Sequence, residues 1–308
     1  MNHFWYRIIS FVLVFILLIL GLIFLTSYIV KSRDFKIYET DSNTLVMGEN
    51  THYDILLSGA SHARNLSRYR NHIRIERILD KSVTNIAQGA ATCGVNEQYF
   101  YLKYFYEQGN SVDQLVYLLS PPLLYSDQLP VASNTFNQEF FSFDFLWSYI
   151  QFDSENKRQR IFEYIRSKLT LDWICTRPVA KSIRDDVLEE VEPDIVNEIL
   201  SMYYNPENSE QRFKVSCATI EEEIRFAAKH DTEVVFIIPP AVFGKWPGHF
   251  EVIDFAREMK EKYSIRYYDL SESITDKKFY YDHHHLNTFG VVKFMKDFMK
   301  PFLENKYE

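Results

Sequence analysis

The chain has 308 residues, and its 34 Lys and Arg against 42 Asp and Glu give a formal net charge of −8. This acidic balance argues against a nucleic-acid-binding protein, because such proteins neutralise phosphates with a basic surface. Charged residues at 25% and hydrophobic residues at 46% are typical of a folded globular protein and exclude a disordered chain.

The first predicted element is a membrane-spanning helix over residues 8–30, which contain no charged side chain. At 1.5 Å per residue this helix is about 34 Å long, enough to cross a hydrocarbon core of about 30 Å. A cleavable signal peptide is the alternative, but its apolar region is usually only ~7–15 residues long and ends in small residues. Residues 26–28, Thr-Ser-Tyr, make a poor cleavage site. We therefore expect an uncleaved anchor over residues 1–36 and one soluble domain over residues 37–308.

The charges beside this helix bear on which side of the membrane the soluble domain lies. Arg7 and the terminal amine precede the helix, whereas Lys31, Arg33 and Lys36 follow it. Counted strictly, the positive-inside rule mildly favours a domain on the cytoplasmic side.

The soluble part alternates short apolar runs with helical patterns. The runs typical of buried parallel strands are residues 54–58, 82–87, 114–119, 233–238 and 266–270. Helices are predicted at residues 63–80, 96–108, 220–230 and 251–263, with a terminal helix at 288–303 that Asn287 caps. This alternation predicts an α/β fold in which helices cover both faces of a parallel sheet of about five strands.

Residues 123–212 interrupt the alternation. They are rich in Phe, Tyr and Trp and mostly helix-like, with charge runs at 155–160 and 184–194. We interpret them as a helical insertion between strands three and four, beside the carboxyl ends of the strands, where α/β sheets bind ligands. Its aromatic residues are expected in the core more than in a ligand groove, and its second charge run on a solvated helix face.

A first candidate for chemistry is the sequence Gly59-Ala60-Ser61-His62. It lies at the predicted junction of strand one and the next helix, where a serine presents its hydroxyl at the top of the sheet. The structural alternative is that Ser61 only caps that helix.

A second candidate is Asp282-His283-His284-His285, just before the terminal helix. A neutral imidazole can take a serine proton if a carboxylate fixes its tautomer, and a single turn could bring Asp282 to His285. For His283 and His284 we expect a solvated or supporting role. The three histidines also suggest a metal site, but no C-x-x-C or H-E-x-x-H spacing accompanies them. We expect neither a metal nor another cofactor.

The three cysteines are widely spaced and indicate neither a zinc ribbon nor a disulfide framework. Cys93 lies beside Gly94 after the second predicted strand. We expect a buried structural cysteine there and not a reactive thiol, because no base is assigned to it.

The two candidate motifs together resemble the SGNH (GDSL-type) hydrolase superfamily. Its members have a flavodoxin-like fold and carry a nucleophile in a G-x-S turn after strand one and an Asp-x-x-His near the C-terminus. The sequences LLSGASHA and DHHHLNTFG behind an N-terminal anchor are similar to the membrane-anchored branch. That branch includes the D-alanyl-lipoteichoic acid transfer proteins and the alginate-type O-acetyltransferases. The resemblance implies that Ser61 is the nucleophile, His285 the base and Asp282 the orienting acid.

The resemblance also implies an oxyanion hole. Residues 85–89 are similar to the second family block, so the backbone N–H groups of Ser61 and Gly89 are the expected donors. The third block normally supplies an asparagine, but residues 119–122 here are Leu-Ser-Pro-Pro. Losing one such donor typically costs ~10²–10³ in rate. The absence of this asparagine favours a specialised transferase or a degenerate member of the superfamily over a general esterase.

The predicted function is that of a membrane-anchored, serine-dependent acyl esterase or O-acyltransferase that acts on a cell-envelope polymer or glycan. The resemblance implies a single-pass protein with an extracytoplasmic domain. Expected partners are the membrane, a glycan or polyol polymer as acyl acceptor and a multi-pass membrane acyltransferase, with no nucleic acid. The alternatives are a catalytically degenerate binding or assembly protein of the envelope and a lipid esterase on the cytoplasmic side.

Overall fold

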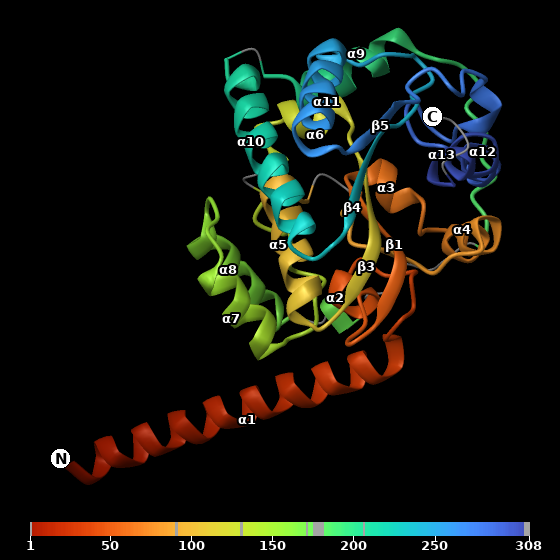
Figure 1. Ribbon diagram of the computed structural model, residues 1–308. Coiled ribbons are helices and arrows are strands. Elements are labelled where there is room, and N and C mark those ends of the chain that lie inside the picture. The colour runs from red at the N-terminus through yellow and green to blue at the C-terminus, as the bar shows by residue number, and fades with distance from the viewer. Residues whose placement is uncertain are drawn as a thin grey trace.

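A parallel sheet of five strands, in the order β2-β1-β3-β4-β5, forms the centre of the described part of the chain (Figure 1). The computed structural model describes residues 2–89, 92–129, 132–170, 172–174, 182–205 and 207–304. The strands are β1 (His52–Gly59), β2 (Val83–Asn85), β3 (Ser111–Leu118), β4 (Glu233–Ile238) and β5 (Arg266–Asp269). All neighbouring strands pair in parallel, in the order of a flavodoxin-like sheet. The predicted α/β fold is confirmed.

Side chains of each central strand enter two separate hydrophobic clusters. In β3, Leu115 and Tyr117 belong to one cluster, whereas Val116 and Leu118 belong to the other. Strands buried on both faces are apolar throughout, which is why they stand out in the sequence. The first cluster is closed by α5 (Val95–Glu107), α10 (Ser209–Ala228) and α11 (His249–Tyr263). The second is closed by α3 (Ser61–Asn65), α4 (Asn71–Leu79) and α12 (Thr288–Phe294).

The C-terminal helical segment begins as predicted. The Asn287 side-chain oxygen accepts the backbone N–H of Gly290 at 3.0 Å and caps α12. A π-helical turn (Met295–Met299) and α13 (Lys300–Leu303) continue the segment.

The helix predicted over residues 63–80 is wrong in one respect, because the structure divides it into α3 and α4. Tyr69 and Arg70 have φ angles of 56° and 58°, which a helix does not allow. The carboxylate of Glu39 accepts both of their backbone N–H groups, at 3.2 and 2.5 Å. A distant residue thus stabilises the break between the two helices.

The N-terminal helix α1 (Asn2–Asp34) is long and apolar enough to cross a membrane (Figure 1). Most of it projects from the domain, but its last turns pack on the segment before α7. The Phe24 and Phe141 rings meet edge to face at 5.2 Å, and Ser27 Oγ accepts the Phe141 N–H at 3.2 Å. Val30 is buried in a small cluster with Leu45.

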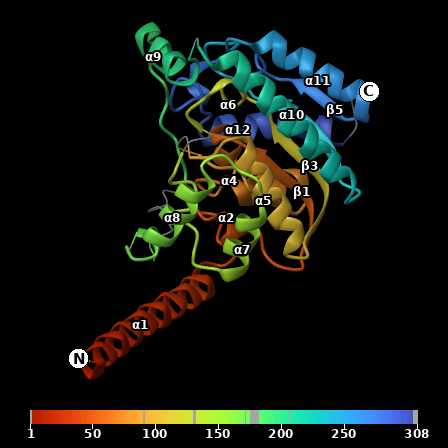
Figure 2. The ribbon, with the colours of Figure 1, turned by 90° about the vertical axis from the view of Figure 1, so that its left-hand side faces the viewer.

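The chain between β3 and β4 is mostly helical. Its elements are α6 (Pro121–Tyr125), α7 (Phe143–Gln151), α8 (Lys157–Ser167), η2 (Asp172–Ile174) and α9 (Pro193–Tyr203). α7 and α8 lie at the end of the domain from which α1 emerges, together with α2 (Asn43–Val46), whereas α9 and α11 lie at the other end (Figure 2).

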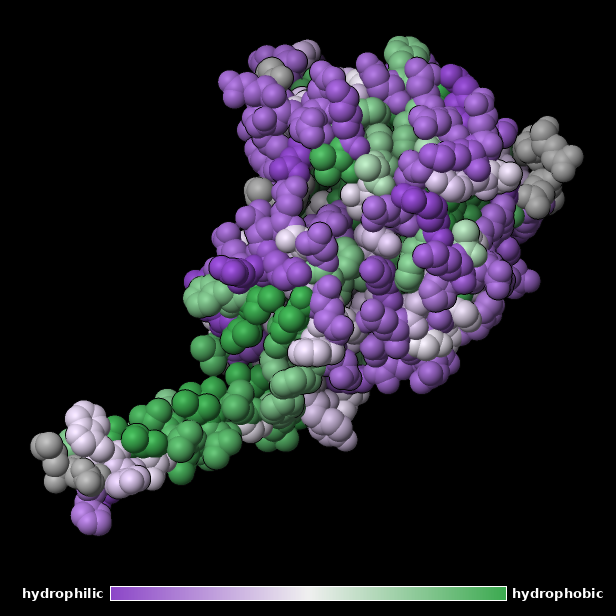
Figure 3. Space-filling view, turned by 60° about the vertical axis from the view of Figure 1, so that its left-hand side comes forward, coloured by the Kyte–Doolittle hydropathy of each residue, from purple (hydrophilic) through white to green (hydrophobic). Residues whose placement is uncertain are grey.

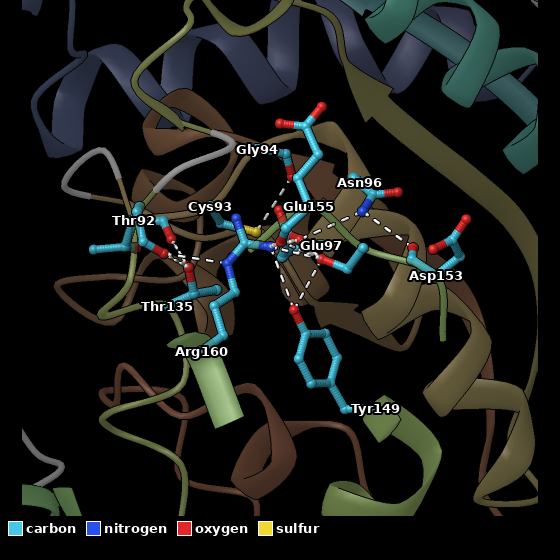
Figure 4. A network of polar contacts seen from close by, with 12 residues as sticks. Thr92, Cys93, Gly94, Asn96, Glu97, Thr135, Tyr149, Asp153, Glu155 and Arg160 are labelled. Carbon is cyan, nitrogen blue, oxygen red and sulfur yellow. Dashed lines mark hydrogen bonds and ion pairs between the residues drawn. The ribbon is translucent and has the colours of Figure 1, made fainter. Parts of the chain in front are cut away.

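A buried ion pair joins α8 to α5. Arg160 and Glu97 are both almost fully buried and bond to each other (Figure 4). Arg160 Nη1 also donates to Ser154 Oγ at 2.7 Å and to the Tyr149 hydroxyl at 3.3 Å. Burial raises the pKa of Glu97 more than the positive charge of Arg160 lowers it. This carboxylate therefore depends on its partners to remain charged inside the protein.

Candidate active site

Ser61 lies at the carboxyl end of β1, directly after a sharp turn. Gly59 has a φ of 133°, and a Cβ there would lie 2.8 Å from the Leu118 carbonyl oxygen, so only glycine fits. Ala60 occupies the N-cap position of α3, and Ser61 is its first residue. The Ser61 hydroxyl caps no helix; its Oγ lies 2.7 Å from His285 Nε2.

His285 connects Ser61 to Asp282. Its Nδ1 lies 2.8 Å from Asp282 Oδ2, while Asp282 Oδ1 accepts the backbone N–H groups of His284 and His285 at 2.9 and 2.7 Å. The backbone bonds fix the carboxylate, and the carboxylate fixes the imidazole with Nδ1 as donor. His285 Nε2 is then free to accept the Ser61 proton, as a nucleophile and its base require.

The charges around this chain of hydrogen bonds favour an ionised Asp282. Burial raises the pKa of Asp282, but the hydrogen bond from His285 and the charges of His285 and His284 together keep it well below its usual range. Burial and, to a lesser extent, the charge of His285 lower the pKa of His62 to about 3, against the opposing effect of Asp282. His62 is thus neutral at physiological pH, and its ring lies 5.2 Å from that of His285.

An extended segment, residues 182–192, holds the loop that carries Asp282 and His285. Backbone hydrogen bonds join Leu188 N to the Tyr280 carbonyl at 2.9 Å and Thr288 N to the Arg184 carbonyl at 2.8 Å. The helix predicted for the second charge run is therefore wrong for residues 182–192, because their backbone groups bond to the loop. The helical part, α9, begins only at Pro193.

Neither of the other two histidines of the motif is fully solvated, because His283 is buried and His284 is half-buried. His283 Nε2 accepts the backbone N–H of Glu192 at 3.1 Å, which ties the loop to the extended segment. The His284 ring meets that of Trp246 edge to face at 5.6 Å. Of the two roles expected for His283 and His284, the supporting one fits the structure.

Ser61 borders two spaces of different character. On one side is a small cavity of about 20 Å³, whose lining includes His62, Cys93, Ser120, Tyr203, Trp246 and His284. On the other side is a wider cleft of about 230 Å³, which Ser61 and His285 line together with Asp41, Arg64, Arg68, Tyr69, Gly89 and Tyr281. Sequence reasoning missed Asp41, Tyr203 and Trp246, which come from segments far from both motifs. For His62, the one sequence feature that could have indicated a place in the site is its position next to Ser61.

The two expected oxyanion donors lie in the same region. Gly89 and Ser61 both line the wider cleft. A Cβ on Gly89 would lie 3.7 Å from Arg64 Cγ, so the backbone there passes close to the α3 side chains. Ser120, which follows β3, lines the small cavity. The oxyanion role of Ser61 and Gly89 stays a prediction.

The segment between α1 and β1 forms one wall of the wider cleft. Arg68 pairs with Asp41, and Arg64 donates to Asn43 Oδ1 at 3.2 Å and to the Thr40 carbonyl. Glu139 in turn accepts the backbone N–H of Asn43 at 2.8 Å. The site is thus built partly from the residues that lead out of α1.

Asp282, His284 and His285 could together hold a cation, because one ligand atom from each lies within 4.8 Å of the others. A cation there would compete with the hydrogen bond between His285 and Asp282. Cys93 is buried, and burial raises the pKa of its thiol well above the usual value, which makes it a poor nucleophile. Cys175 lies outside the described residues.

Known proteins similar to this chain were found only among solved structures. No protein-family model matches the chain, and no curated protein matches its sequence. Among solved structures, a presumed acylhydrolase from Bacteroides fragilis is similar, with 8% sequence identity and a TM-score of 0.38 over 82% of this chain and 87% of that one. A TM-score of this size carries no argument about activity.

Proposed function

We propose that this protein is a membrane-anchored, serine-dependent acyl esterase or O-acyltransferase that acts on a cell-envelope polymer or glycan. The observation that supports it most is the unbroken chain of hydrogen bonds from Ser61 through His285 to Asp282. The resemblance of the two motifs to the membrane-anchored SGNH branch points to the same chemistry.

The proposed reaction starts with attack of Ser61 Oγ on an ester carbonyl carbon, while His285 Nε2 takes the hydroxyl proton. Asp282 holds the imidazole and stabilises the imidazolium that forms. The backbone N–H groups of Ser61 and Gly89 stabilise the oxyanion. When the C–O bond of the ester breaks, His285 gives the proton to the leaving alcohol, and the acyl group stays on Ser61. A second alcohol, or water, then gives its proton to His285 and attacks the acyl carbon. The bond between that carbon and Ser61 Oγ breaks, and His285 returns the proton to Ser61.

The two spaces beside Ser61 suggest how the reactants are placed. In this proposal the small cavity receives the acyl group, and the wider cleft receives the sugar or polyol hydroxyl. Two arginines and one aspartate line that cleft, which suits an acceptor with negative charge. A domain outside the cytoplasm, anchored through α1, would meet such an acceptor at the membrane surface. A multi-pass membrane acyltransferase would be a suitable acyl donor.

A fluorophosphonate probe tests this proposal, because it reacts with an activated serine. We expect Ser61 to be labelled, labelling to be lost in Ser61→Ala, and labelling to persist in Ser120→Ala, a matched serine in the small cavity. A membrane-impermeant probe applied to sealed vesicles of known orientation reports the side of the membrane at the same time. A folded chain that no probe labels would favour the degenerate binding protein, and labelling only from the cytoplasmic side would favour the lipid esterase.

The pH profile of a His62 variant tests whether His62, as well as the proposed base His285, controls the activity in acid. We expect kcat/KM to fall in acid, as it does in any enzyme whose general base must be unprotonated to act. Because burial lowers the pKa of His62 to about 3, His62 is already neutral across this range. His62→Gln should therefore keep the acid limb at the same pH, even if kcat changes. A displaced acid limb in that variant would show that His62 shares the titration.

A further inference from the structure

α7 and α8 each expose a second apolar stripe besides the one they bury. In α7 the stripe residues are spaced i, i+4 and i+7 and follow one side of the helix. In α8 two residues are spaced i and i+3, and a third exposed apolar residue, Leu169, follows in the turn after the helix ends at Ser167. Their exposed fractions run from 41% to 64%. We call these six residues the outer apolar face: Phe143, Trp147, Ile150, Phe162, Ile165 and Leu169.

The buried side of each helix is fixed, so the outer apolar face cannot turn inward. α7 buries Phe145 and Tyr149 in the main cluster. α8 buries Tyr164 and Arg160, and the ion pair of Arg160 with Glu97 holds the helix against α5 (Figure 4). Exposure of these large side chains is therefore a property of the folded domain.

The outer apolar face continues the apolar surface of α1. Ile23, Ser27 and Val30 of α1 are half-buried or buried along one side, which is the side that meets the domain. The Phe141 ring contacts Phe24 of α1 at 5.2 Å and Phe143 of α7 at 6.4 Å. Figure 3 shows the hydrophobic surface of α1 running into a hydrophobic area on the domain. The last turns of the uncharged part of α1 thus lie level with α7.

We propose that α7 and α8 lie in the membrane interface, with the outer apolar face inserted into the same bilayer that α1 crosses. A bilayer fits better than a protein partner because the face is continuous with a helix whose own surroundings would be lipid. Trp147 suits the headgroup level, and the exposed Arg158 and Arg166 suit lipid phosphates beside it. This second attachment fixes the orientation of the domain relative to the membrane. It does not depend on the proposed enzymatic activity.

Quenching by brominated lipids tests the insertion. The full chain is reconstituted in vesicles of phosphatidylcholine and phosphatidylglycerol, with and without bromine on the acyl chains. The Trp147→Phe variant is measured in the same vesicles. The difference between the emission of the two chains is the emission of Trp147. We expect brominated lipid to remove most of the Trp147 emission. The control is Phe250→Trp in the Trp147→Phe chain, since Phe250 is exposed on α11 at the other end of the domain. Its added emission should not be quenched.

The remaining outcomes separate the alternatives. Quenching that stays constant as the protein is diluted into more lipid supports the proposal. If quenching is lost when the ratio of protein to lipid is raised, a second copy of the chain covers the outer apolar face, and the proposal is overturned. The third outcome is a Trp147 that is exposed to water and not quenched. Because these vesicles contain no other protein, that result would mean that the outer apolar face binds a membrane-protein partner. It would also overturn the proposal.

Discussion

Asp282→Asn is expected to lower acyl release or transfer about 10⁴-fold, as loss of the orienting carboxylate does in a triad on another fold. The amide can still accept the backbone N–H groups of His284 and His285 through its oxygen. Its NH₂ group, however, cannot accept the His285 Nδ1 proton, so the wrong tautomer is favoured and Nε2 no longer accepts the Ser61 proton. Turnover and thermal melts of the two chains give the measurement.

The difference in melting temperature between the two chains should depend on pH, and the direction of this dependence follows from the pKa of Asp282. The folded-state pKa of Asp282 lies below its unfolded value, so the carboxylate stabilises the folded chain above about pH 4. That contribution disappears as the pH falls through the folded-state pKa. The variant should therefore melt a few degrees lower near neutral pH, and the difference should shrink in acid.

Two further variants show whether the residues act as a unit. Ser61→Ala should be at least as damaging as Asp282→Asn, and the double variant should lose little more than Ser61→Ala alone. Full activity of Asp282→Asn at an unchanged melting temperature would reject the triad. Losses that simply add in the double variant would mean that Asp282 acts on something other than the Ser61–His285 pair.

Arg160→Met is expected to destabilise the chain by about 3–5 kcal/mol, because it leaves the Glu97 carboxylate buried without its partner. Both side chains are almost completely buried, so solvent does not replace the lost interaction. The free energy of unfolding of the detergent-solubilised chain, from urea titration, gives the measurement.

The matched control is Arg166→Met on the same helix, where an exposed arginine pairs with Glu163. A surface pair of this kind contributes only about 0–1 kcal/mol. Combining Arg160→Met with Glu97→Leu should recover part of the lost stability, because no buried charge then remains. Equal losses in the Arg160 and Arg166 variants would contradict the assigned role of the buried pair.

Local patterns predicted the elements of this fold well where burial imposes a simple rule on the sequence. The run at residues 233–238 became β4 with the same bounds, because a strand covered on both faces must be apolar throughout. Asn287 was predicted as a cap and is one, since its role depends only on the next three residues. The break between α3 and α4 was not predictable, because it depends on Glu39, some thirty residues earlier in the chain.

The chemistry of the site divides in the same way. The sequence by itself determined that a serine follows the first strand and that Asp282 and His285 share one turn, because both are features of a few adjacent residues. It also determined the uncharged helix at the N-terminus. Only the tertiary structure brought His285 Nε2 to 2.7 Å from Ser61 Oγ, since the two residues meet only when the ends of the sheet are assembled. It also decided that residues 182–192 hold the loop in an extended form and that Tyr203 and Trp246 enclose the small cavity. These contacts join segments far apart in the chain, and no local pattern of charge or hydropathy specifies them.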